Sequence, residues 1–91
     1  MHLFATAKFR RDYKRCKKRG LDMQLLQDVL DTLQKEEPLD AKYHDHELSG
    51  KYHKFRECHI QPDWLLIYHV SKDALILTAS RTGTHSDLLD M

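Results

Sequence analysis

The feature that most constrains this fold is the run WLLIYHV at residues 64–70, in which His69 alone is strongly polar. A short, nearly continuous apolar run is typical of a central strand that is covered on at least one face. Turn residues bound it on both sides, at 61–63 (QPD) and 71–73 (SKD), and Pro62 presets its own backbone angle. We therefore predict a central strand over residues 64–70.

Three other segments are predicted to join this strand in a sheet. Residues 54–60 alternate between polar and apolar side chains, and residues 74–80 supply a further apolar segment directly after the second turn. Consecutive strands with short links pair antiparallel, so we expect both to flank the central strand. Residues 2–6 (HLFAT) are short and apolar and predict one more strand.

Between the first strand and the rest, two helices are predicted. Phe9, Tyr13 and Cys16 recur at helical spacing over residues 7–19, with Thr6 as the cap and Gly20 as the stop. Over residues 22–37 a broad apolar face follows Asp22, which caps the second helix, and Pro38 ends it. Its members are Leu25, Leu26, Val29, Leu30 and Leu33.

The predicted fold class is α+β. A small antiparallel sheet packs against an N-terminal helical hairpin in the order β-α-α-β-β-β, and a short C-terminal helical turn over residues 85–89 is capped by Thr84. Residues 39–52 are expected to be irregular. Ninety-one residues are enough for one modest core, so we expect a single domain over 1–91.

Charge is distributed unevenly along the chain. The totals nearly balance, at 15 Lys and Arg against 14 Asp and Glu, but residues 8–19 hold eight basic side chains and one acid, Asp12. A basic face of this kind fits a protein that meets a polyanion. A solvated helix face explains the same charges equally well. The candidate RNA-binding side chains of this segment are Lys8, Arg10, Arg11, Lys14, Arg15, Lys17 and Lys18.

Cysteine spacing and hydropathy exclude several classes. Cys16 and Cys58 lie far apart and show neither zinc spacing nor a secreted disulfide framework, so we expect free thiols in a reducing cytoplasm. No apolar run approaches the roughly 18 residues that a membrane helix needs. We expect no membrane partner.

Histidine is the residue type that points to chemistry, with seven in the chain. Its side chain exchanges protons near neutral pH. RNA cleavage needs a base for the 2′-hydroxyl, an acid for the leaving 5′-oxygen and a cation for the phosphate, and it needs no metal because the nucleophile is in the substrate. The candidate catalytic residues are His46, His59, Asp63, Arg81 and His85.

In this set Asp63 would orient a ring or accept a proton, Arg81 would clamp the phosphate, and Trp64 would offer a plane for an unpaired base. Each residue also has a structural explanation: a histidine at a strand end is often a surface residue, Trp64 begins an apolar run, and an aspartate after proline is common in turns. The triplet 44–46 (HDH) invites a metal site, but no further ligand stands at diagnostic spacing. We expect no metal and no other cofactor.

The segments KYHDHELSGKYHKFRECHIQPDWLLIY and SRTGTHSDLL resemble the YafQ branch of the RelE/ParE superfamily of bacterial toxins. The recognisable blocks of that branch are KDHPLxG, an HxxPDWxLIY run and RxGxHxxLF. The similarity covers nearly the whole chain. It implies a RelE-like fold and places the family's catalytic positions at His46, His59, Asp63, Arg81 and His85, with Trp64 beside them.

By the same resemblance, the chain is expected to be the toxin of a type II toxin–antitoxin system. It would be a ribosome-dependent endoribonuclease that cuts messenger RNA in the aminoacyl site of the 70S ribosome, and a cognate antitoxin would neutralise it. His85 and the group around His59 and Asp63 would divide the acid and base roles. The basic helix would contact ribosomal RNA.

Two positions depart from the family pattern. Glu47 stands where proline follows the block histidine, which would free the backbone beside His46, and Leu89 stands where an aromatic residue is common. The alternative is therefore a non-catalytic binding protein: a degenerate toxin acting with its antitoxin as a co-repressor, or a gyrase-poisoning relative. The polar set of five argues against the gyrase version, which has no need of it.

Overall fold

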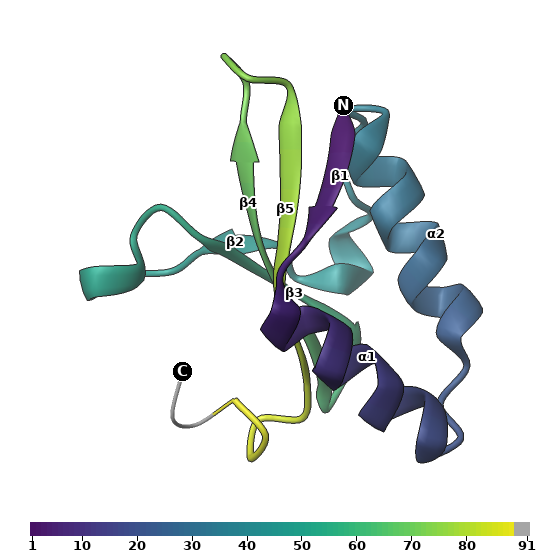
Figure 1. Cartoon of the computed structure of the whole chain (residues 1–91). Coiled ribbons are helices and arrows are strands. Elements are labelled where there is room, and N and C mark those ends of the chain that lie inside the picture. The colour runs from purple at the N-terminus through teal and green to yellow at the C-terminus, as the bar shows by residue number, and fades with distance from the viewer. Residues whose placement is uncertain (89–91) are drawn as a thin grey trace.

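The computed structural model describes residues 1–88, and these form two helices and a five-stranded sheet in the order β1-β5-β4-β3-β2 (Figure 1). The elements are β1 (His2–Ala5), α1 (Ala7–Lys18), α2 (Met23–Gln34), β2 (His46–Glu47), β3 (Arg56–Gln61), β4 (Trp64–Ser71) and β5 (Ile76–Gly83), with short 3-10 helices η1 (Ala41–Tyr43) and η2 (Gly50–Tyr52). The predicted α+β fold class is confirmed. No helix within residues 1–88 is both long and apolar enough to span a bilayer.

The helix ends follow from local side chains. The Thr6 hydroxyl accepts a hydrogen bond from the Phe9 amide at 3.0 Å, and the Asp22 carboxylate accepts one from the Gln24 amide at 3.1 Å. Gly20 has a φ of +85°, the left-handed conformation that ends many helices. All three predicted helix signals are confirmed.

The sheet confirms one prediction and corrects another. β4 lies between β3 and β5 and pairs antiparallel with both. β1, however, lies parallel to β5, with Leu3 opposite Leu77, so the sheet is not wholly antiparallel. Parallel pairing requires a long crossover, and the segment that contains both helices provides one.

Two strand boundaries also differ from the prediction. Residues 39–52 were expected to be irregular, yet β2 pairs His46 with Glu57; two residues are too few to show a period. β5 runs to Gly83 instead of ending at residue 80. The reason is Thr82, whose buried hydroxyl donates to the Leu65 carbonyl at 2.7 Å and so satisfies its polarity inside the sheet.

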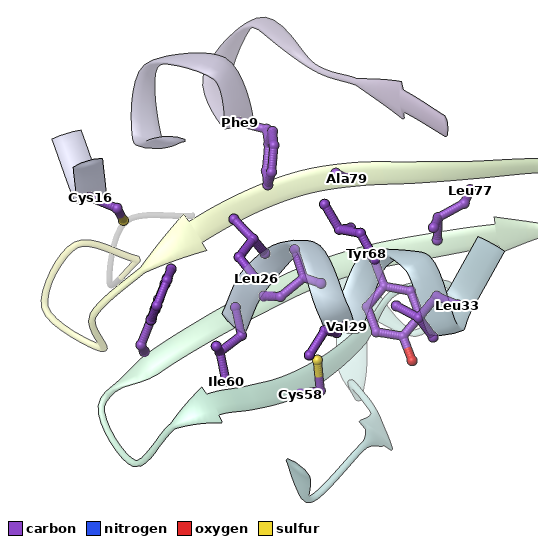
Figure 2. Close-up of a cluster of buried hydrophobic side chains, with 13 residues drawn as sticks. Phe9, Cys16, Leu26, Val29, Leu33, Cys58, Ile60, Tyr68, Leu77 and Ala79 are labelled. Atoms are coloured by element: carbon purple, nitrogen blue, oxygen red, sulfur yellow. The ribbon is translucent and has the colours of Figure 1, made fainter. Parts of the chain in front are cut away.

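Both faces of β4 are covered. The two helices lie on one side of the sheet (Figure 1), and the main core fills the space between the helices and the sheet. Figure 2 shows Leu26, Val29 and Leu33 of α2 among side chains of β3, β4 and β5. On the other face, Leu65 and Ile67 form a smaller cluster with Leu88. Alternating side chains of one strand thus enter two cores, which explains the unbroken apolar run.

Cys16 and Cys58 are both free and buried in the main core. Burial raises the pKa of the Cys58 thiol to about 12 and also raises that of Cys16. A thiol that stays protonated is a poor nucleophile, so both cysteines are core residues.

Candidate functional site

Three histidine rings from separate parts of the chain lie next to one another. His46 comes from β2, His59 from β3, and His85 from the turn after β5. The ring of His59 is in the middle, with its centroid 6.4 Å from that of His46 and 5.8 Å from that of His85. We call these three residues the histidine row. The structure thus brings the three predicted histidines together.

Each ring of the row is oriented by an acceptor at Nδ1. His46 Nδ1 lies 2.8 Å from the His44 carbonyl oxygen, and His59 Nδ1 lies 3.4 Å from the Pro62 carbonyl oxygen. A carbonyl oxygen only accepts, so in both rings Nδ1 is the donor. Nε2 is then the nitrogen that can exchange a proton with a ligand.

The His85 ring is also oriented through Nδ1, in this case by a carboxylate. Its Nδ1 is 2.6 Å from Oδ1 of Asp63, and its backbone amide donates to the same oxygen at 3.1 Å. These bonds from the ring and the amide hold the pKa of Asp63 below its usual range. Both side chains are more than half exposed, so the pair is accessible from solvent. Asp63 therefore orients the His85 ring, one of the two roles that the sequence analysis considered for it, and its part in catalysis stays a prediction.

The C-terminal turn that carries His85 is itself anchored. The Asp87 amide donates to the Thr84 hydroxyl, and the Asp87 carboxylate accepts from the Thr84 amide at 2.9 Å. Arg19 adds two bonds to that carboxylate, at 2.6 and 3.1 Å, and these lower the pKa of Asp87 well below its usual range. The predicted cap at Thr84 is confirmed for the turn up to Leu88, whereas Leu89 lies outside the described residues.

Glu57 is a site residue that the sequence analysis missed. Its Oε1 lies 3.4 Å from Nε2 of His46 and 3.7 Å from Nε2 of His59. Its side chain is mostly buried, so its charge acts on both rings with little screening by water. A signal was available: β3 alternates, which places Glu57 and His59 on the same face.

Arg81, expected to clamp a phosphate, forms an ion pair with an acid of α1. Its Nε lies 2.7 Å from Oδ2 of Asp12 on α1, and its Nη2 lies 3.3 Å from Oδ1. Asp12 is buried, and it also accepts the Thr82 amide at 3.2 Å. Arg81 thus ties α1 to β5. Its role as a phosphate clamp stays a prediction.

Trp64 requires a correction. The sequence analysis expected its ring to offer a plane for an unpaired base, but the side chain is 2% exposed and lies in the main core. The indole N–H donates to the Thr82 hydroxyl at 2.9 Å. A ring enclosed in this way has no open face, so base stacking on Trp64 is contradicted. Its place at the start of an apolar run was the better guide.

The basic helix α1 presents most of its charges to solvent. Among the candidate RNA-binding residues, Arg15 alone is half-buried, and its guanidinium bonds Asp12 at 2.9 Å. The exposed members are Lys8, Arg10, Arg11, Lys14, Lys17 and Lys18. Their contact with RNA stays a prediction.

Within the triplet 44–46, the rings of His44 and His46 lie beside His59, whereas Asp45 does not face them. The Asp45 carboxylate contacts the sheet, where it accepts hydrogen bonds from Nη2 of Arg56 at 3.0 Å and from the Tyr68 hydroxyl. Burial, and after it the bond to Asp45, raises the pKa of Tyr68. Among residues 1–88 no three histidine, cysteine or acidic side chains are grouped as metal ligands.

The sequence analysis expected that Glu47, in place of proline, would free the backbone beside His46. The structure instead pairs Glu47 in a strand. It lies in β2 opposite Arg56, and its Oε1 is 3.4 Å from Arg56 NH1. The strand pairing and the bond from the His46 ring to the His44 carbonyl together fix His46.

Comparison with known proteins gives consistent results. Residues 1–90 match the family described as bacterial toxin of type II toxin–antitoxin system, YafQ. The mRNA interferase toxin YafQ of Escherichia coli K12 is 37% identical over 84 residues, which cover 91% of this chain and 89% of that protein.

Solved structures agree. A metal-bound toxin from Helicobacter pylori is 42% identical with a TM-score of 0.91, covering 97% of this chain and 98% of the other. YafQ in the Escherichia coli DinJ–YafQ complex is 36% identical with a TM-score of 0.86, covering 94% of each chain.

Proposed function

Because the chain belongs to the YafQ family of toxins from type II toxin–antitoxin systems, we propose that it is an endoribonuclease that cuts messenger RNA on the ribosome. The observation that carries the proposal is the histidine row, in which three rings have Nδ1 oriented by an acceptor. Acid–base catalysis needs groups of this type held within reach of one phosphate. The similar Escherichia coli protein is named an mRNA interferase.

The reaction follows from the chemistry of RNA. A base takes the proton of a 2′-hydroxyl, and the 2′-oxygen attacks the adjacent phosphorus. The bond from phosphorus to the 5′-oxygen breaks, and an acid protonates that oxygen. The products are a 2′,3′-cyclic phosphate and a 5′-hydroxyl, so two proton-exchanging groups are sufficient.

We assign the acid role to His85. The ionised Asp63 carboxylate, 2.6 Å from Nδ1, stabilises the positive charge that the ring carries before it donates from Nε2. His46 or His59 then acts as the base. Glu57, which lies within 3.7 Å of Nε2 of both rings, stabilises the charge that forms when the base accepts a proton.

We propose α1 as the surface that meets the ribosome. Its exposed lysines and arginines lie on a helix whose only acid, Asp12, is buried and paired. Such a surface contributes sequence-independent binding to RNA phosphates. The site of action is therefore the cytoplasm, where messenger RNA occupies ribosomes.

We further propose that a small antitoxin protein neutralises the chain. The similar Escherichia coli protein is found in a complex with DinJ. A partner that covers α1 or the histidine row would block contact with RNA, and a segment that folds on binding can wrap such a surface.

The test is to incubate the purified protein with messenger-programmed ribosomes and, separately, with the same RNA alone, and to map the cut sites by primer extension. We expect in-frame cuts only with ribosomes. The His85→Ala variant should lose on the order of 10²- to 10⁴-fold in rate, as expected for removal of a positioned acid.

His53 provides a matched control, because its Nδ1 also faces a carbonyl oxygen, that of Gly50 at 3.3 Å, but it directly follows η2 and is not part of the histidine row. His53→Ala should cut at the wild-type rate. Absence of cuts by folded wild-type protein would refute the proposed function, and equal loss in both variants would show that the row is not special.

A further inference from the structure

A groove of about 690 Å³ lies beside the histidine row. It is lined by Leu25 of α2, by Tyr43 and His44 at the end of η1, and by His59 and Pro62 at the end of β3. Apolar walls with a small number of polar groups are typical of sites for small organic groups. We call it the Tyr43 groove.

The Tyr43 groove and the histidine row share a wall. His59 belongs to both, and the ring of His44 meets that of His59 edge-on with centroids 5.9 Å apart. A nucleotide whose phosphate lies against His59 therefore has the groove within reach of its base. The two surfaces are continuous.

The groove has an aromatic side chain, that of Tyr43, which is more accessible than the buried ring of Trp64. Trp64 is buried, so it has no face for a base. Tyr43 is half-buried at the edge of the main core, with Lys42 Nζ 5.2 Å from its ring centroid. Proteins that bind single-stranded RNA place its bases on aromatic side chains.

The wall of the groove is built at a conformational cost. His44 has a φ of +49°, a left-handed conformation that is unfavourable for a residue other than glycine. The next residue is fixed, because Asp45 is bonded by Arg56 and Tyr68. The strained backbone is thus held in place, and it keeps the His44 ring beside His59.

We propose that the Tyr43 groove holds one unpaired base of the RNA, next to the phosphate that is cut, and thereby sets a sequence preference of the cut. Leu25 and Pro62 would cover the base, and Tyr43 would stack on it. Lys42 and Gln61, also in the lining, supply polar groups for the edge of the base. This inference rests on the proposed function and names a subsite of it.

The test compares two tyrosines in similar settings. Tyr52 follows Lys51 on η2, and Nζ of Lys51 lies 5.2 Å from the Tyr52 ring centroid. The pair Lys42 and Tyr43 has the same separation, but Tyr52 lies outside the groove lining. Cut sites are mapped on ribosomes programmed with a message library for wild type, Tyr43→Leu and Tyr52→Leu. We expect Tyr43→Leu to flatten the preference at one nucleotide position and to raise KM on the order of 10-fold, with kcat nearly unchanged. Tyr52→Leu should behave as wild type.

Tyr43 contacts the core, so folding is checked by circular dichroism, and a second pair repeats the comparison with the exposed lysines. Lys42→Ala should weaken the preference, whereas Lys51→Ala should not. A wild-type preference in both groove variants would overturn the inference while leaving the proposed function intact. Weaker antitoxin binding with unchanged preference would also overturn it, because the groove would then be a protein docking site.

A binding experiment without cleavage separates the two failures. An RNA trinucleotide with 2′-O-methyl groups cannot be cut, and NMR titration of the protein with it should shift the Tyr43 ring signals and leave those of Tyr52 in place. If wild type never cuts RNA, the proposed function fails and this titration decides the groove. Equal shifts at both rings would contradict the groove as the site.

Discussion

At the scale of single residues, orientation matters more than identity. The chain has seven histidines, and three of them lie next to one another with an acceptor at Nδ1, which leaves Nε2 as the nitrogen that can exchange a proton. Asp63 and Glu57 then differentiate the rings, because one carboxylate orients His85 and the other lies between His46 and His59. The acid and base roles can therefore be separated by experiment.

The role of His85 can be tested with a sulfur leaving group. Replacing the 5′-oxygen at the cut site by sulfur makes departure possible without protonation, so loss of an acid no longer matters. We expect His85→Ala to cut this message at close to the wild-type rate while remaining on the order of 10²-fold or more slower on normal RNA. Single-turnover cutting on programmed ribosomes measures both rates.

His46→Ala and His59→Ala are the comparison in that experiment. A base is still needed to activate the 2′-hydroxyl, so the variant that lacks the base should stay slow on both messages. Recovery of either variant on the sulfur message, with His85→Ala still slow, would reverse the assignment.

Asp12 is a residue whose main effect should be on stability. It is buried, and it bonds Arg81 and the Thr82 amide. Asp12→Ala leaves the mostly buried Arg81 guanidinium without this partner, and we expect a loss of about 3 kcal/mol in the free energy of unfolding. Urea denaturation measures it. Asp28→Ala on the exposed face of α2 should cost less than about 1 kcal/mol, and equal costs would contradict the tether between α1 and β5.

At the scale of elements, the site depends on where short segments are anchored. β2 has two residues, but it places His46 opposite Glu57. The turn after β5 carries His85 and is anchored to α1 through Asp87 and Arg19. The turn contributes only Leu88 to the smaller cluster, so the ionic contact of Asp87 is a large part of what positions it, and we expect acid to loosen this turn first.

The anchor at Asp87 predicts a specific pH dependence. Its folded pKa is lowered by Arg19, so the carboxylate stabilises the fold above the ordinary aspartate pKa, near 4, and this contribution is lost as pH falls from about 4 through the lower folded value. At pH 7 the free energy of unfolding of wild type should exceed that of Asp87→Asn by about 1 kcal/mol. The difference is modest because Arg19 is exposed.

Urea unfolding at pH 7, 4 and 2.5 measures this difference. The difference between wild type and Asp87→Asn should shrink only below about pH 4. As the control, Asp73→Asn, in the exposed turn between β4 and β5, should have the same free energy of unfolding as wild type at every pH. A difference that is constant down to pH 2.5 would contradict the ionic anchor.

Local signals predicted most of these elements, and long-range contacts account for the errors. The caps at Thr6 and Asp22 act within a few residues, so the sequence was sufficient. The direction of β1 depends on a pairing with residues 76–79, for which no local signal exists.

The candidate site divides in the same way. Convergence of the three histidines followed from family motifs, whereas Trp64 and Arg81 were assigned without knowing that Thr82 and Asp12 would take their polar groups. The alternation of β3 placed Glu57 on the face of His59, but its contact with His46 depends on β2, which was too short to predict.

At the scale of the whole molecule, charge is segregated. The net charge is only +1, yet the exposed face of α1 is basic. We expect Lys14→Glu with Lys17→Glu to weaken ribosome association and to reduce its dependence on salt, by a slope of about 1 for each lost phosphate contact. Sedimentation with ribosomes from 50 to 200 mM salt measures it. Lys35→Glu with Lys72→Glu, outside α1, is the control, and an equal effect there would contradict a localised binding face.

The contacts that complete the fold also set an order in time. β1 pairs with residues 76–79, and Asp12 bonds Arg81 across 69 positions of the chain. Contacts between such distant segments form late in folding, because the loop between them must close first. During translation, β1 cannot pair until residues 76–79 have left the exit tunnel, and Asp12 cannot bond Arg81 until residue 81 has done so. His85 emerges later still, so the ribosome that synthesises this protein has made nothing able to cut its own message until residues 1–85 are all outside the tunnel.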